Sequence, residues 1–69
     1  MNETATVNVR GMSCDHCVNA VSREVAGIPG VTGVEVELAT GLVRIDAERP
    51  LSAAEIAAAI ETAGYEVEP

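Results

Sequence analysis

The sequence predicts an α+β sandwich whose elements follow the order strand, helix, strand, strand, helix, strand. Two observations support this order: apolar residues alternate with polar ones in several short stretches, and two longer stretches carry them at helical spacing. No linker, repeat or low-complexity tract interrupts residues 1–69, so we expect a single domain. A ferredoxin-like βαββαβ arrangement, with two helices on one face of a four-stranded antiparallel sheet, would bury all these apolar faces.

The first strand is expected over residues 4–10, because Ala5, Val7 and Val9 face one way and the polar residues between them face the other. Gly11 ends this alternation. A helix follows, with an apolar face at helical spacing: Val18, Val21, Val25 and Ile28. A helix-stopping run then ends it: Gly27, Pro29 and Gly30. The strand and the helix are therefore joined by a loop that carries cysteines.

A β-hairpin is expected in the middle of the chain. Valine and leucine alternate with Glu35 and Glu37 over residues 34–38. After a turn at Thr40 and Gly41, a second alternation begins, with Val43, Ile45 and Ala47. The hairpin would present one acidic face to solvent.

The second helix is predicted to begin at a capping box, the pattern S-x-x-E formed by Ser52 and Glu55. Its apolar face follows: Ala53, Ile56, Ile60 and Ala63. Gly64 ends this helix, and Tyr65 with Val67 makes a short last strand. These elements complete the predicted sheet.

The composition excludes several classes of partner. Eleven acidic residues against four arginines give a net charge of -7, whereas nucleic acids and anionic membranes are bound through clustered positive charge. The charge instead favours a partner with a basic docking face. No leader peptide or membrane-spanning stretch is visible, so we expect a cytoplasmic protein without membrane insertion.

The stretch from Gly11 to Cys17 holds both cysteines and the only histidine of the chain. Cytoplasmic thiols are kept reduced, so a C-x-x-C pair is expected to bind metal or to perform redox chemistry. Cys17 falls near the first helical turn, where the helix dipole favours a thiolate. Two thiols and one histidine cannot supply the four ligands of a structural zinc site. A small number of soft ligands is instead suited to copper(I).

Four of these residues, Gly11, Met12, Cys14 and Cys17, match the G-M-x-C-x-x-C motif that heavy-metal-associated domains carry between their first strand and first helix. The resemblance covers nearly the whole chain, including the order of elements and the pair Gly64-Tyr65. Within this family, the sequence is most similar to the small bacterial copper chaperones of the CopZ type, whose motif often reads M-S/T-C-x-H-C.

The resemblance implies a role for each matched position. Cys14 and Cys17 would be the Cu(I) ligands, Met12 would be tucked inward to shape the loop, and Tyr65 would lie near the site. Relatives that handle zinc or cadmium tend to carry an acid immediately before the first cysteine. Ser13 occupies that position here, which favours copper without excluding zinc or cadmium.

His16 has two interpretations. It is either an exposed residue of the helix start or a group that tunes the thiolates, since an imidazole titrates near neutral pH. We expect modulation, or a third ligand in a copper-bridged dimer, rather than primary ligation. Without copper, the protein is expected to be a monomer.

The leading hypothesis is a copper(I) chaperone, not an enzyme, that binds one ion and passes it by ligand exchange to a copper-transporting P-type ATPase. A copper-responsive transcriptional regulator is a further candidate partner.

Several alternatives remain open. The chain could be a metal-binding domain excised from such an ATPase, although Met1 close to the first strand favours a free-standing protein. A thiol-disulfide oxidoreductase is disfavoured by the short chain and by an element order unlike that of thioredoxin. A mercury-binding relative would usually carry an export signal.

Overall fold

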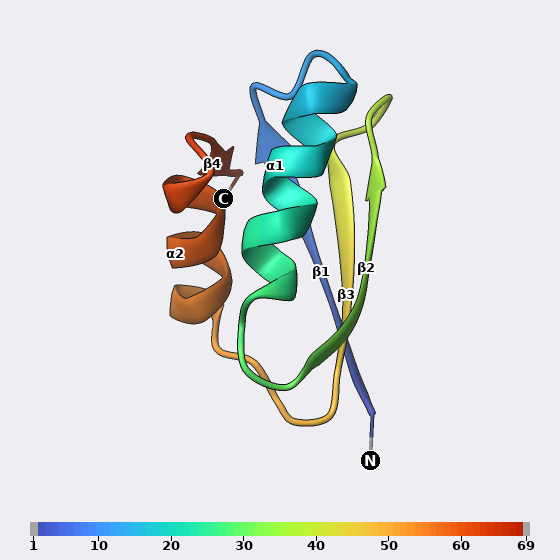
Figure 1. Cartoon of the computed structure of the whole chain (residues 1–69), viewed down its shortest axis with the longest axis vertical. Helices are drawn as coiled ribbons and strands as arrows, with labels where there is room; N and C mark the ends of the chain where they lie inside the picture. The colour runs from blue at the N-terminus through green and yellow to red at the C-terminus, as the bar shows by residue number, and fades with distance from the viewer. Residues whose placement is uncertain (1, 69) are drawn as a thin grey trace.

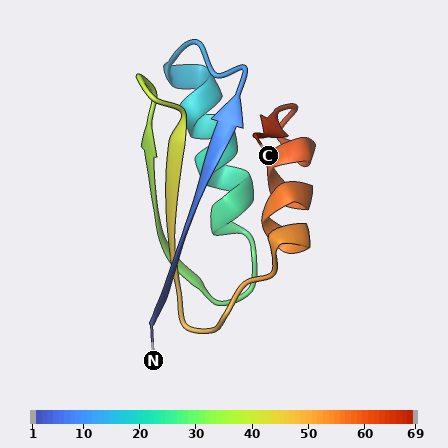
Figure 2. The same ribbon diagram turned by 180° about the vertical axis from the view of Figure 1, so that it is seen from behind.

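The computed structural model describes residues 2–68 and confirms the predicted order of elements (Figure 1). The strands are β1 (Glu3–Arg10), β2 (Val31–Glu37), β3 (Leu42–Ala47) and β4 (Glu66–Val67), and the helices are α1 (Asp15–Ala26) and α2 (Ala53–Thr62). The sheet has the order β2-β3-β1-β4, and all its pairs are antiparallel. Figures 1 and 2 show both helices on one face, as expected for a ferredoxin-like sandwich.

The register of the central pair places the apolar faces together. β1 pairs with β3 from Glu3↔Ala47 to Asn8↔Leu42, so the inward positions of both strands share one face. A slip by one residue would turn these side chains to solvent. The buried core cluster consists of aliphatic side chains: Val9, Val21, Val25, Ile28, Val43, Ile45, Ile56, Ala59 and Ile60.

Some predicted boundaries were wrong. Helix α1 ends at Ala26, and Ile28 lies beyond it but still joins the core, because the chain turns back towards β2 there. Strand β2 begins at Val31 rather than at residue 34, with a β-bulge between Val31 and Gly33 that interrupts the alternation.

Two further differences concern α2 and the last strand. Ala53 is exposed in the first turn of α2, and Ala59 is buried instead, beside Ile56 and Ile60. Tyr65 precedes β4 rather than belonging to it. In the part of the chain that the structure describes, no helix is long and apolar enough to cross a membrane.

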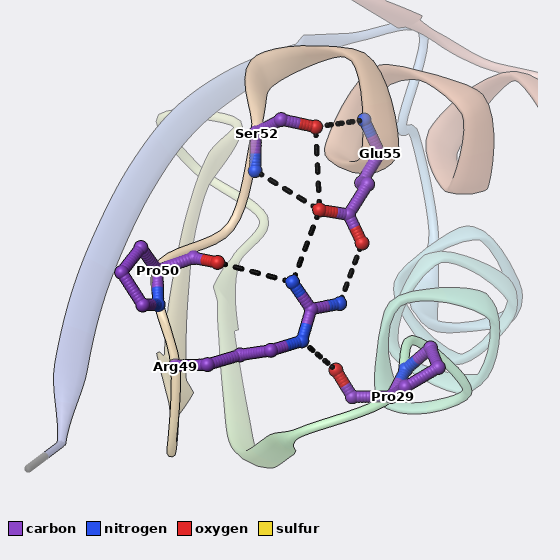
Figure 3. A network of polar contacts seen from close by, with 5 residues as sticks. All are labelled: Pro29, Arg49, Pro50, Ser52 and Glu55. Carbon is purple, nitrogen blue, oxygen red and sulfur yellow. Dashed lines mark hydrogen bonds and ion pairs between the residues drawn. The ribbon is translucent and has the colours of Figure 1, made fainter.

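A polar network joins the connections at the end of the molecule where α2 begins (Figure 3). Arg49 donates through Nε to the carbonyl oxygen of Pro29 at 2.9 Å and through Nη1 to that of Pro50 at 3.0 Å. Its Nη2 lies 2.6 Å from Oε2 of Glu55. We call this network the Arg49 clamp. It ties the α1–β2 connection to the start of α2.

The predicted capping box is present at the start of α2. The backbone N–H of Glu55 donates to Oγ of Ser52 at 3.1 Å, and the backbone N–H of Ser52 donates to Oε1 of Glu55 at 3.2 Å. The hydrogen bond from Arg49, followed by the one from the Ser52 backbone, lowers the pKa of Glu55 to about 2. The first turn of α2 is therefore held by an ionised carboxylate.

Candidate metal site

The two cysteines lie where the loop after β1 becomes helix α1, at the opposite end of the molecule from the Arg49 clamp (Figure 1). Cys14 is the N-cap residue, with an extended backbone at φ -157° and ψ 174°. Its carbonyl oxygen accepts hydrogen bonds from the backbone N–H groups of Cys17 at 3.0 Å and Val18 at 3.2 Å. The start of the helix thus fixes the Cys14 backbone, while its side chain makes no capping hydrogen bond.

The helix start also brings the two thiols together. An N-cap side chain and the side chain three residues later lie on the same end of a helix, which is the geometry that a capping box uses. Here the two Sγ atoms of Cys14 and Cys17 lie 3.6 Å apart, and both cysteines are free thiols. Cys14 is exposed and Cys17 is half-buried. One soft metal ion can therefore reach both sulfur atoms from solvent.

Cys17 is the more polarised of the two groups. Its pKa is lowered to about 6, chiefly by the backbone amide of Ser13 and then by the hydroxyl of Tyr65. The Ser13 hydroxyl also lies 3.9 Å from the Cys17 sulfur. The pKa of Tyr65 is raised in turn, because its hydroxyl bonds the thiolate and is partly desolvated. At neutral pH Cys17 is mostly a thiolate, the form that binds metals.

Tyr65 also supports the base of the loop. Gly11 has a φ of +92°, and a Cβ atom built on it would lie 3.3 Å from the Tyr65 ring. The ring therefore packs against the loop where it leaves β1. Met12 is half-buried and packs against the core. No local pattern predicts the contact between Gly11 and Tyr65, because the two residues are far apart in the chain.

The structure does not bring His16 into the thiol pair. His16 and Asp15 are exposed in the first turn of α1. Within residues 2–68, no group of three or more histidine, cysteine, aspartate or glutamate side chains is arranged to hold a metal ion. The structure thus places Ser13 and Tyr65 against the thiol of Cys17, and the role of His16 stays a prediction.

Residues 6–66 match the family described as heavy-metal-associated domain, and this range includes both cysteines and nearly all of the fold. The chain belongs to the heavy-metal-associated domain family. The resemblance inferred from the G-M-x-C-x-x-C motif is therefore confirmed.

The relatives of this heavy-metal-associated domain include two groups of copper-handling proteins. The first holds copper chaperones: the chain is 48% identical to the copper chaperone CopZ of Staphylococcus haemolyticus over 62 residues, which is 88% of this chain and 91% of the relative. A solved structure of a CopZ metallochaperone matches with a TM-score of 0.88 and 36% identity, over 96% of this chain and 100% of that chain.

The second group holds domains of transporters. The N-terminal domain of a potential copper-translocating P-type ATPase from Bacillus subtilis, solved in its Cu(I)-loaded state, matches with a TM-score of 0.85 and 26% identity. The match covers 99% of this chain and 86% of that domain. Small chaperones and transporter domains thus share this fold.

Proposed function

We propose that the protein is a copper(I) chaperone that binds one Cu(I) ion through Cys14 and Cys17 and delivers it to a copper-transporting P-type ATPase. The observation that carries this proposal is the thiol pair itself, with sulfur atoms 3.6 Å apart at the start of α1, one on the exposed Cys14 and one on the half-buried Cys17. Thiolates in low number select Cu(I) over harder metals. The 48% identity to a copper chaperone adds independent support.

The geometry also suits transfer by ligand exchange. Two thiolates leave the ion open to a third ligand, and the exposed Cys14 is the side from which a thiolate of the acceptor can approach. A third bond can form before one of the first two breaks, so the ion need not be released into water. The protein then acts as a carrier of copper rather than as an enzyme, and copper is its cargo.

The remaining features of the proposal concern context. The net charge of -7 favours an acceptor with a basic docking face, either the ATPase or a copper-responsive transcriptional regulator. Reduced thiols fit the cytoplasm. We propose a monomer without copper and a copper-bridged dimer at high loading, in which His16 is the candidate third ligand.

The test is a competitive titration of the reduced protein with Cu(I) and Zn(II) in the presence of a chelator of moderate Cu(I) affinity. We expect one Cu(I) per chain to be withdrawn from the chelator, and Zn(II) not to displace it. The variant Cys14→Ser should lose this binding. Retained binding in Cys14→Ser, or no competition by the unaltered protein, would exclude the proposal.

Thiol-disulfide exchange is the second candidate, because the short distance between the sulfur atoms and the low pKa of Cys17 also suit a redox pair. An insulin-reduction assay separates the two functions. Catalytic turnover of insulin would favour the oxidoreductase, whereas stoichiometric transfer of Cu(I) to an ATPase domain without turnover would favour the chaperone.

A further inference from the structure

The tip of the β2–β3 hairpin touches strand β1, which leads into the loop of residues 11–14 before α1. We call this loop the metal loop, because the proposed function places the metal there. The backbone N–H of Val9 donates to the carbonyl oxygen of Gly41 at 2.8 Å, and the N–H of Gly41 donates to the carbonyl oxygen of Glu37 at 2.9 Å. The first bond joins the hairpin to β1, and the second closes the turn itself. Figure 1 shows this tip at the same end of the molecule as the loop before α1.

Only glycine fits at position 41. Its φ is +75°, and a Cβ atom there would lie 2.6 Å from the carbonyl oxygen of Val9, a distance that real Cβ atoms essentially never show. The obstructing atom belongs to the backbone, so it cannot swing away as a side chain would. The hairpin tip reaches Val9 because residue 41 has no side chain.

Val9 is held from its other edge as well. It pairs with Val67 of β4, and its own side chain is buried in the core. Two residues further on, Gly11 lies against the ring of Tyr65. The last part of β1 is therefore fixed by the hairpin, by β4 and by Tyr65 immediately before the chain leaves for Cys14.

We propose that Gly41 is a positioning residue for the metal loop. Its close contact with Val9 sets where β1 ends, and this end sets where the loop places Cys14 and Cys17. The expected effect of Gly41 on Cu(I) affinity rests on the proposed function. Its effect on the geometry of the loop can be measured in the protein without metal.

The chain offers a matched control in Gly30, at the other end of the molecule. Gly30 also has a positive φ, +91°, but a Cβ atom there would meet the flexible Arg49 side chain at 3.0 Å. Gly41→Ala and Gly30→Ala therefore carry the same kind of backbone strain. Only Gly41→Ala places its Cβ against the backbone of Val9, which leads to the metal loop.

The experiment records backbone amide NMR shifts of both variants in the reduced, metal-free state, followed by Cu(I) competition. We expect shifts over residues 9–17 in Gly41→Ala and none there in Gly30→Ala. The Cu(I) affinity should fall about 10-fold in Gly41→Ala, as for residues that orient metal ligands, and should change less than about 2-fold in Gly30→Ala.

The variant Gly41→Asn covers the case in which Gly41→Ala fails to fold, because asparagine tolerates a positive φ better but still carries the obstructing Cβ. Unchanged loop amides in a folded Gly41 variant, or equal loop shifts in Gly30→Ala, would overturn the positioning role. If the unaltered protein binds no copper, the proposed function fails, and the amide shifts still decide the role of Gly41.

Discussion

Helix α1 begins with Cys14 at the N-cap and Cys17 three residues later, and helix α2 begins with Ser52 and Glu55 at the same two positions. The pair on α2 is turned to the backbone: each side chain accepts a hydrogen bond from the other residue's N–H. On α1, the two side chains instead face each other, with the sulfur atoms 3.6 Å apart, and Cys14 makes no capping hydrogen bond.

The comparison shows how one local geometry serves two purposes. An oxygen acceptor at the N-cap stabilises a helix by about 1 kcal/mol, because it satisfies an N–H group that has no partner within the helix. Sulfur is a weak acceptor and leaves that stabilisation largely unused. The side chains at the start of α2 therefore stabilise the helix, and the ion pair between Arg49 and Glu55 adds to this. The side chains at the start of α1 stay available to a metal ion.

Replacing the cysteine pair of α1 by the residues of the α2 capping box should have the largest effect. The double variant Cys14→Ser/Cys17→Glu introduces a capping box at the start of α1. We expect Cu(I) binding to be abolished, since both soft ligands are gone, and the metal-free protein to be more stable by about 1 kcal/mol. Chelator competition measures the first effect and denaturant unfolding of the reduced protein measures the second.

His16→Ala is the matched control for this variant, because it alters the same exposed helical turn and keeps both thiols. Cu(I) affinity should be largely retained. A loss comparable to that of the double variant would show that the imidazole is a primary ligand and that two thiolates do not suffice.

Breaking the Arg49 clamp should have the next largest effect, on the melting temperature. The clamp lies at the opposite end of the molecule from the two cysteines. Arg49→Gln removes the ion pair with Glu55 and the bond to the Pro29 carbonyl, so the melting temperature should fall by several degrees while Cu(I) affinity stays unchanged. Arg44→Gln is the control, because Arg44 meets Asp46 only at 3.8 Å on an exposed surface. Equal melting temperatures of the two variants would contradict the clamp.

Local motifs explain which parts of the molecule could be predicted from the sequence. The S-x-x-E and C-x-x-C patterns lie within single helical turns, so the spacing alone predicts that Ser52 meets Glu55 and indicates that Cys14 lies beside Cys17. The alternation of apolar and polar residues is also a local pattern, and it predicted the strands. It failed near Gly33, where a β-bulge interrupts the period of two.

Contacts between distant segments could not be predicted in this way. Arg49 reaches the Pro29 carbonyl across twenty positions, and the sequence identified Gly41 only as a turn residue, not as a neighbour of Val9. Such contacts follow from how the elements pack, and no periodicity or spacing records them.

The clamp should also respond to pH, with a smaller effect. The pKa of Glu55 is lowered from 4.5 to about 2, so the stability that its ionised form contributes is fully present above about pH 4.5. This contribution should be lost as the pH falls towards 2. The stability difference between the unaltered protein and Arg49→Gln should therefore narrow between pH 5 and pH 2, which urea unfolding at each pH measures. A difference that stays constant over this range would contradict an ionic clamp.

The smallest expected effect concerns the thiolate of Cys17. Its rate of alkylation by iodoacetamide should rise with a midpoint below the ordinary pKa of a thiol, read in Cys14→Ser so that a single thiol reacts. In that background, Tyr65→Phe should move the midpoint to higher pH, because the hydroxyl that bonds the thiolate is removed. Ser13→Ala should move it less, since the backbone amide, the largest cause of the lowered pKa, remains. A larger shift in Ser13→Ala than in Tyr65→Phe would show that the serine hydroxyl, 3.9 Å from the sulfur, holds the thiolate instead.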